Sequence, residues 1–476
     1  MKKNGRKYRK TQREKEIKKN RIGNLRTHIC QEVNGINTAY FSMARTVTHN
    51  PIIMGLMETK REYLRRLKSY INAGGWNCGK LECAELAAYE KIILDSSKIE
   101  NSYDISFYKY YILFDLVHIL AYEFEILDVE KVKEQYKADF ENSANPMIVD
   151  RIFELNSNSR RKVKRLLREP ELAIEKEYIQ LMEKNILFKR KEPTGIMVTA
   201  NMSAGKSTFI NALTGKYVCL SQNMACTSKV HYIINKAFED GFFTEYDHDL
   251  VFTASKEELL NDNELNLSDE IVVSTRFIGG LAHQRMIIND SPGVNYSGDE
   301  EHKKIAEKLM QDKNYNLLIY IMNATQLATN DESDHLDYVK KHIGKIPVLF
   351  VINKVDAFNI EEENIEATVQ RQTKMLKQKG FKDPIVCPVS ARAGYLAKKY
   401  QSDGLSNSEK RELYNYIDKF DEMGLNNYYN KIFKRIVIED EKCEEKQLLK
   451  TSGLAYIEKI IIAMCKGGNT NGSNIY

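Results

Sequence analysis

The stretch GIMVTANMSAGKSTFINALTG, residues 195–215, is the part of the sequence that decides the fold. Apolar residues at 196–198 predict a buried strand, and the apolar spacing over 209–213 predicts an amphipathic helix. Between them stands AxxxxGKS, in the strand, loop and helix order of a Walker A phosphate-binding loop. In such a loop Lys206 reaches the β- and γ-phosphates, and the Ser207 hydroxyl coordinates Mg²⁺. The sequence therefore predicts an α/β fold built around a nucleoside triphosphate.

The predicted loop departs from the motif at one position, because Ala200 stands where the first glycine belongs. A side chain is tolerable there only if the φ angle of that residue is negative. The remaining small residues allow backbone N–H groups and the helix N-terminus to form an anion-binding nest. The predicted phosphate contacts are Ala200, Asn201, Met202, Ser203, Ala204, Gly205, Lys206, Ser207 and Thr208.

A DxPG sequence follows the next apolar strand expected at the site, residues 285–288. The Asp290 carboxylate can hold Mg²⁺ through water, and the backbone amide of Gly293 can face the γ-phosphate. Both residues follow the end of a strand, where the ligands of α/β folds bind. This second motif supports the nucleotide site.

The base-binding end of the site is predicted by an NKxD sequence after a strand at 348–352. The Asp356 carboxylate only accepts hydrogen bonds, which suits the N1–H and 2-amino donors of guanine. Adenine lacks that pair of donors and would leave the acceptor unsatisfied. A further strand at 385–389 is followed by a loop that can meet guanine O6. The predicted base contacts are Asn353, Lys354, Asp356, Ser390, Ala391 and Arg392.

These motifs together resemble the dynamin superfamily, especially bacterial dynamin-like proteins. The resemblance covers roughly residues 190–467, and it is strongest at SAGKSTFINALTG, DSPG, NATQL and NKVD. It implies a P-loop GTPase domain with a mixed sheet flanked by helices. The helical pattern of residues 29–191 separately predicts an all-α helical bundle segment before this domain. The resemblance also implies hydrolysis of GTP to GDP and phosphate, activated by dimerisation across the GTPase domain.

The resemblance assigns chemical roles to individual residues. It implies that Ser203 and carbonyls of switch I hold a monovalent cation, K⁺ or Na⁺, in place of an arginine finger. Switch I contributes Thr227, or alternatively Ser228, as a Mg²⁺ ligand that also orients the attacking water. The catalytic set is Ser203, Lys206, Thr227 and Gly293, and the Mg²⁺ set is Ser207, Thr227 and Asp290.

One departure from the family pattern leaves a second function open. Met202 occupies the position at which eukaryotic dynamins carry a water-orienting glutamine, so we expect slow basal turnover. The alternative is a slowly hydrolysing, GTP-switched module that recruits a protein partner through its helices. A ribosome- or RNA-associated GTPase is the least favoured reading.

Charge is concentrated at the N-terminus. Residues 1–21 carry eleven basic and two acidic side chains, whereas the whole chain of 476 residues has a net charge of only +5. This arm is expected to be a solvated tail, or a contact for anionic lipid. Nucleic acid is less favoured, because Tyr8 is the only aromatic residue available for stacking. The eight scattered cysteines suit a reducing cytoplasm, with peripheral attachment if a membrane is involved.

The sequence divides into a basic arm (1–24), a helical bundle segment (25–190), the GTPase domain (191–467) and a flexible tail (468–476). Residues 238–266 are expected to be an acidic, turn-rich insertion without an assigned role. The short C-terminal part lacks the long trunk of most dynamin-like proteins, so a companion dynamin-like subunit is expected to supply it. Predicted helices before the GTPase domain are 36–48, 57–73, 80–96, 105–127, 129–140, 146–155 and 171–187.

Overall fold

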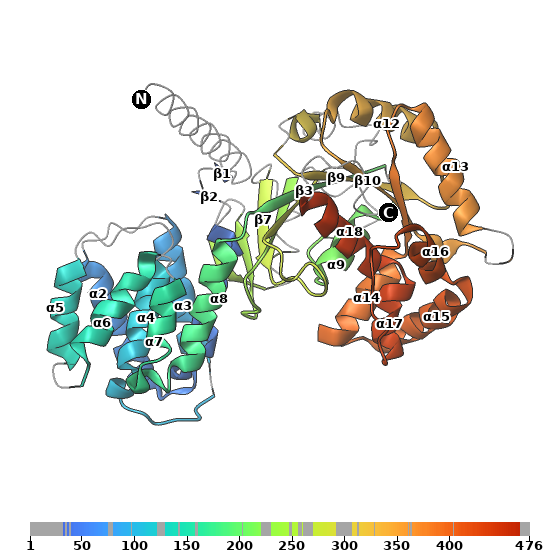
Figure 1. Cartoon of the computed structure of the whole chain (residues 1–476). Coiled ribbons are helices and arrows are strands. Elements are labelled where there is room, and N and C mark those ends of the chain that lie inside the picture. The colour runs from blue at the N-terminus through green and yellow to red at the C-terminus, as the bar shows by residue number, and fades with distance from the viewer. Residues whose placement is uncertain are drawn as a thin grey trace, which may run out of the picture.

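The structure is a computed structural model, and it combines one large sheet, helices on both faces of that sheet, and a separate helical segment (Figure 1). This arrangement confirms the predicted α/β domain preceded by an all-α segment. The described residues are 32–33, 36–37, 40–74, 80–96, 98–120, 129–140, 143–157, 160–201, 203–219, 230–246, 250–255, 259, 270–291, 307–311, 314–327, 329–359, 361, 364–402 and 404–466.

The sheet has nine strands in the order β11-β10-β9-β3-β8-β4-β7-β5-β6. The five strands from β11 to β8 are mutually parallel, whereas β4 runs antiparallel to β8. The carboxyl ends of the parallel strands therefore meet at one edge of the sheet, where α/β folds bind their ligands. The strands are β3 (Thr194–Ala200), β4 (Val230–Asn235), β5 (Phe243–Tyr246), β6 (Leu250–Ala254), β7 (Glu270–Thr275), β8 (Met286–Asp290), β9 (Leu317–Asn323), β10 (Val348–Asn353) and β11 (Ile385–Val389).

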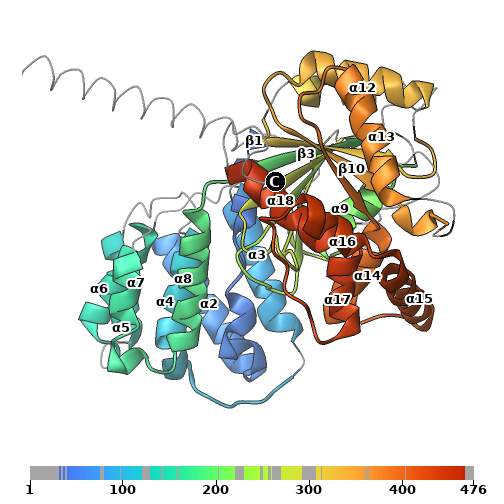
Figure 2. The same cartoon turned by 45° about the vertical axis from the view of Figure 1, so that its right-hand side comes forward.

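Helices cover both faces of this sheet. Helices α9 and α18 lie on one face and α12 and α13 on the other (Figure 2). Several begin with the expected side-chain caps: Thr329 caps α12, Asn364 caps α13, and Ser406 forms a capping box with Glu409 at α15. The helices are α9 (Lys206–Thr214), α12 (Asn330–His342), α13 (Ile365–Gln378), α14 (Ala391–Ser402), α15 (Asn407–Met423), α16 (Leu425–Ile432), α17 (Glu444–Thr451) and α18 (Leu454–Lys466).

The helical segment lies beside the sheet, on the side away from α14–α17 (Figures 1 and 2). Its central helix is α4, whose described side chains after Lys109 are all buried. No helix in the described part of the chain is long and apolar enough to span a membrane. The helices are α2 (Met57–Ala73), α3 (Lys80–Asp95), α4 (Lys109–Leu120), α5 (Val129–Phe140), α6 (Pro146–Phe153), α7 (Arg160–Leu166) and α8 (Lys176–Lys189).

Some predicted elements of this segment are wrong. The helix expected at 36–48 is a short strand (Ile36–Asn37) followed by 3₁₀ turns at Tyr40–Ser42 and Val47–His49. The apolar residues of this stretch do not form one helical face. They pack separately against neighbouring elements; Phe41, for example, packs in the core of the sheet. Helix α8 begins at Lys176 rather than at 171, because Pro170 starts a separate 3₁₀ turn. The helix expected at 105–127 has an initial 3₁₀ turn, and residues 121–127 lie outside the described residues.

The expected insertion at 238–266 contains two strands, which corrects the sequence prediction. Strands β5 and β6 form an antiparallel pair that extends the sheet beyond β7. Helix α3 packs against β6, and Arg45 lies over the Phe252 ring at 4.0 Å. The extension is therefore the surface against which the helical segment packs.

Buried charges reinforce this contact. The Arg45 guanidinium donates to Glu85 at 3.2 Å, its Nη1 lies 3.7 Å from Asp240, and its backbone N–H donates to Asp240 at 2.9 Å. Lys236 Nζ pairs with the same Asp240 carboxylate at 2.9 Å. All four side chains are buried, so each charge depends on its partners. The network joins α3 to the loop that leads from β4 into β5.

Candidate nucleotide-binding site

Those predicted site residues that the structure describes meet at the carboxyl edge of the parallel strands. Ala200 is the last residue of β3, Asp290 the last of β8 and Asn353 the last of β10. Ala200 has extended backbone, so its methyl group fits where the motif has glycine. Ser390 directly follows β11, and Lys206 begins α9. Four motifs that are far apart in the sequence thus converge on one place.

Asn353 ties the phosphate loop to the loop after β11. Its side-chain amide donates to the Ala204 carbonyl at 2.9 Å, and its Oδ1 accepts the Ala391 backbone N–H at 3.0 Å. The loop approaches so closely that a Cβ on Gly205 would lie 2.5 Å from Nδ2 of Asn353. Gly205 also has φ +82°, a left-handed conformation that glycine adopts without strain. Glycine is therefore required at this position for two independent reasons.

Lys206 and Asp290 form an ion pair at the start of α9. The second carboxylate oxygen of Asp290 accepts the Cys219 thiol at 3.6 Å. Burial and the nearby carboxylate raise the pKa of the Cys219 thiol well above its ordinary value. In this arrangement the loop lysine and the strand carboxylate neutralise each other.

The residues around this pair fit a magnesium ion. The Ser207 hydroxyl, half-buried in the first turn of α9, and the Asp290 carboxylate are hard oxygen donors of the kind that Mg²⁺ prefers. The third predicted ligand, Thr227, lies outside the described residues, as do Met202 and Gly293.

The first part of the phosphate loop, at Asn201 and Ser203, is held by contacts from α12 and from the end of β9. Ser203 is exposed and has φ +60°, and its carbonyl accepts a hydrogen bond from Asn323 Nδ2 at 3.3 Å. The ring of His335 on α12 hydrogen-bonds Asn201 Oδ1 at 3.1 Å and Thr199 Oγ1 at 3.4 Å. Burial lowers the pKa of His335 to about 4, so it stays neutral at physiological pH.

These two supporting residues were missed by sequence reasoning. Asn323 opens the NATQL stretch, so the motif marked its position without indicating its contact with Ser203. His335 lies in an ordinary helical pattern and carried no signal, because its partners come from elements more than 130 residues away in the sequence.

At the base-binding end, Asp356 and Arg392 differ in whether another described side chain already pairs with them. The half-buried Asp356 carboxylate makes no hydrogen bond or ion pair with another described residue, so it is available to a ligand. The Arg392 guanidinium instead forms a bidentate pair with Glu412 of α15, at 2.9 and 2.7 Å. This pairing raises the pKa of Arg392 and lowers that of Glu412. Lys354 has φ +67°, and its Cε lies 3.6 Å from the position of a Cβ on Gly205.

Comparison with known proteins agrees with this geometry. Residues 196–355, from β3 into the NKxD loop, match the profile of the dynamin family. This part of the chain belongs to the dynamin family. No curated protein matches the chain.

Several solved structures are similar to this chain at low identity. Era from Aquifex aeolicus bound to GDP·AlF₄⁻ is 16% identical over 42% of this chain and 51% of its own, with a TM-score of 0.26. Era in complex with MgGDPNP and a fragment of 16S ribosomal RNA is 17% identical over 42% of this chain and 52% of its own, also with a TM-score of 0.26. A member of an oligomerised bacterial dynamin pair is 15% identical over 85% of this chain, with a TM-score of 0.36. The chain spans between about half and 60% of the length of these proteins.

Proposed function

We propose that this protein binds GTP at the carboxyl edge of β3, β8, β10 and β11 and hydrolyses it to GDP and phosphate. The observation that carries the proposal is Asn353, which links the phosphate loop at Ala204 to the loop at Ala391. This link supports a single site in which the phosphate-binding loop holds the phosphates and Asp356 accepts from guanine.

In the proposed reaction Lys206 leaves Asp290 and pairs with the β- and γ-phosphates, where it stabilises developing charge. Ser207 and Asp290 would hold Mg²⁺, which when bound neutralises phosphate charge. The backbone N–H groups of residues 203–208 hold the phosphate oxygens at the helix N-terminus. We further propose that Thr227 and Gly293 orient the attacking water, and that Ser203 holds K⁺ or Na⁺.

Guanine recognition can be tested by exchanging one acceptor. In Asp356→Asn one carboxylate oxygen becomes an NH₂ donor, which no longer accepts the 2-amino group of guanine but can donate to the 2-carbonyl of xanthine. We expect the variant to prefer xanthosine triphosphate to GTP in a fluorescent-nucleotide titration. Asp421→Asn, an exposed change on α15, is the matched control. An unchanged preference for GTP in Asp356→Asn would reject Asp356 as the base-reading residue.

Hydrolysis is tested by phosphate release over a range of protein concentrations, with Lys206→Ala as the blank. Family membership supports self-association through the GTPase domain, which predicts that specific activity rises with concentration. Replacing K⁺ and Na⁺ with a larger cation tests the monovalent site. A rate at blank level, with GTP still bound, would favour a nucleotide-switched binding module instead.

Membrane action is a further part of the proposal. The basic arm at 1–21 supports contact with anionic lipid, and the thiols Cys219, Cys387, Cys443 and Cys465, none of them in a disulfide, support a cytoplasmic location. A companion dynamin-like subunit would complete the membrane-acting assembly. Sedimentation with anionic and neutral vesicles, using the full chain and a form that lacks residues 1–21, tests the lipid contact.

A further inference from the structure

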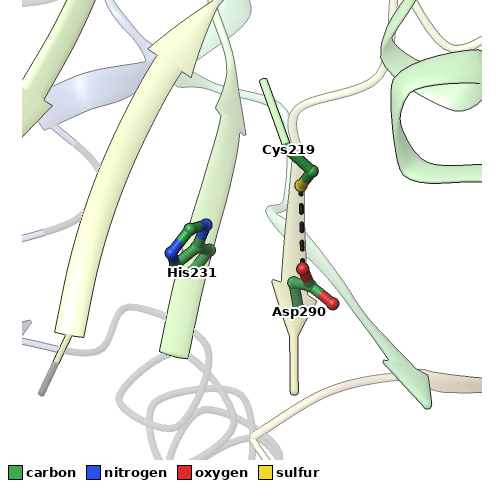
Figure 3. Close-up of side chains that lie close together, drawn as sticks. All are labelled: Cys219, His231 and Asp290. Carbon is green, nitrogen blue, oxygen red and sulfur yellow. Dashed lines mark hydrogen bonds between the residues drawn. The ribbon is translucent and has the colours of Figure 1, made fainter. Parts of the chain in front are cut away.

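Three side chains that are typical metal ligands lie together beside the proposed nucleotide site. Cys219, His231 and Asp290 are all buried, and their ligand atoms lie within 4.8 Å of one another. Figure 3 shows that they come from separate elements, the segment after α9 and strands β4 and β8. We propose that these residues form a binding site for a thiophilic divalent cation such as Zn²⁺, occupied when the nucleotide is absent.

Each ligand is positioned by contacts of the backbone. The side chain of Asn211 on α9 accepts the Cys219 N–H at 2.9 Å and donates to the Cys219 carbonyl at 2.8 Å. His231 and Asp290 are direct partners in the antiparallel pairing of β4 and β8, so they are fixed opposite each other. Because these contacts hold the backbone of each ligand, the three side chains lose little freedom on binding an ion, which favours affinity.

The separation between the thiol and the carboxylate suits tetrahedral coordination. The metal–ligand lengths of zinc place sulfur and oxygen ligands about 3.5 Å apart in a tetrahedron. The Cys219 sulfur lies 3.6 Å from Asp290 Oδ2, close to that value without rearrangement. The ion would replace the thiol proton between these two atoms, and a water molecule would be the fourth ligand, because three protein ligands leave one position open.

The ligand chemistry distinguishes this ion from magnesium. Thiolate and imidazole favour zinc and related transition metals, whereas Mg²⁺ prefers oxygen ligands throughout. Asp290 is common to both sets, since we propose that it also serves nucleotide-bound Mg²⁺. The two ions therefore compete for one carboxylate, and this competition rests on the proposed GTP site.

Cobalt is a direct probe, because Co²⁺ bound to thiolate shows a sulfur-to-metal charge-transfer band and intense visible bands when tetrahedral. We expect the nucleotide-free full chain to bind one Co²⁺ with both features and to lose them when Zn²⁺ is added. Cys219→Ser should abolish the charge-transfer band and weaken binding at least roughly tenfold, the lower end of what losing even an outer-shell partner costs. Cys443→Ser, at a half-exposed thiol far from the site in sequence, should leave both features unchanged.

A wild-type spectrum without the charge-transfer band, or one that Cys219→Ser leaves intact, would overturn the proposal. His231→Gln provides a second variant, whose visible bands should lose intensity as imidazole is removed. Circular dichroism verifies that both variants fold. Adding GTP with Mg²⁺ should then release the cobalt from the wild type. If the protein binds cobalt but does not bind GTP, adding GTP cannot release the cobalt. That result would reject the proposed GTP site and leave the metal site standing.

Discussion

Asp115 predicts a pH dependence of stability that originates in the helical segment. Its carboxylate is buried in α4 and accepts hydrogen bonds from Tyr63 at 2.7 Å, from Asn50 at 2.9 Å and from Tyr178. Burial outweighs these three donors and raises the pKa of Asp115 to about 7, against an ordinary value of 3.8. The folded protein therefore keeps a proton that the unfolded chain has already lost between about pH 4 and pH 7.

The magnitude follows from this difference in pKa. Because the folded state binds more protons in that window, the contribution of Asp115 is fully present below about pH 4 and is lost as the pH rises through about 7. The difference between the two pKa values corresponds to about 4 kcal/mol at most. His118 acts in the opposite direction: burial lowers its pKa to about 3, so its contribution is present above about pH 6.5 and is lost as the pH falls toward 3. The two effects oppose each other, so the wild-type curve alone would hide them.

A difference measurement isolates Asp115. We expect the free energy of unfolding of the wild type, relative to Asp115→Asn, to fall by up to about 4 kcal/mol between about pH 4 and pH 7.5. Urea unfolding of the full chain, followed by far-ultraviolet circular dichroism, measures this difference. Asp95→Asn, an exposed change at the end of α3, is the control and should show no such trend. Wild-type and Asp115→Asn curves that stay parallel over this range would refute the reasoning.

Three further changes test contacts in the α/β domain and its packing surface. Glu458→Gln leaves the buried Lys398 ammonium, now 2.6 Å from that carboxylate, without its partner, and we expect a loss of about 3–5 kcal/mol in thermal or urea unfolding. Gly205→Ala places a side chain at φ +82° and against Asn353, which costs at least about 1–2 kcal/mol, and we expect weaker nucleotide binding with unchanged helix content. Arg45→Met leaves its two carboxylate partners buried and should speed hydrogen exchange in β5 and β6.

Matched variants make these expectations decisive. The double change Lys398→Met with Glu458→Met removes both charges and should recover much of the stability lost in Glu458→Gln. Gly404→Ala, at another left-handed glycine with open space around it, should leave nucleotide binding intact, so equal losses at both glycines would contradict the steric argument. Exchange in β5 and β6 that Arg45→Met does not change would show that Arg45 does not hold the helical segment to the sheet.

The sequence predicted the parts of the fold whose signals are local. The strand that leads into Lys206 and the strand that ends at Asn353 were both recognisable, because a phosphate loop and an NKxD sequence each need a fixed local geometry. Helix α2 was predicted with its observed bounds, since its apolar residues repeat with helical spacing over several turns.

The parts that failed depend on distant partners. Strands β5 and β6 carry buried polar residues such as Thr244 and Glu245, which made the stretch look like a solvated insertion. Arg45 looked like a residue of an amphipathic helix, yet its conformation is set by Glu85 and by Asp240, 195 residues further along the chain. The Lys206–Asp290 pair and the thiol contact of Cys219 likewise arise only when remote strands come together.

Both outermost strands of the sheet, β11 and β6, are contacted by other parts of the chain. On one edge, Tyr428 and Tyr429 donate hydrogen bonds to the carbonyls of Val386 and Pro388 on β11. On the other edge, α3 packs against β6. Exposed strand edges are the usual route to unwanted pairing between sheets, and here each outermost strand is in contact with another part of the chain. If the chain self-associates as proposed, these contacts direct the copies to surfaces other than the outermost strands, among them the one that bears the phosphate loop.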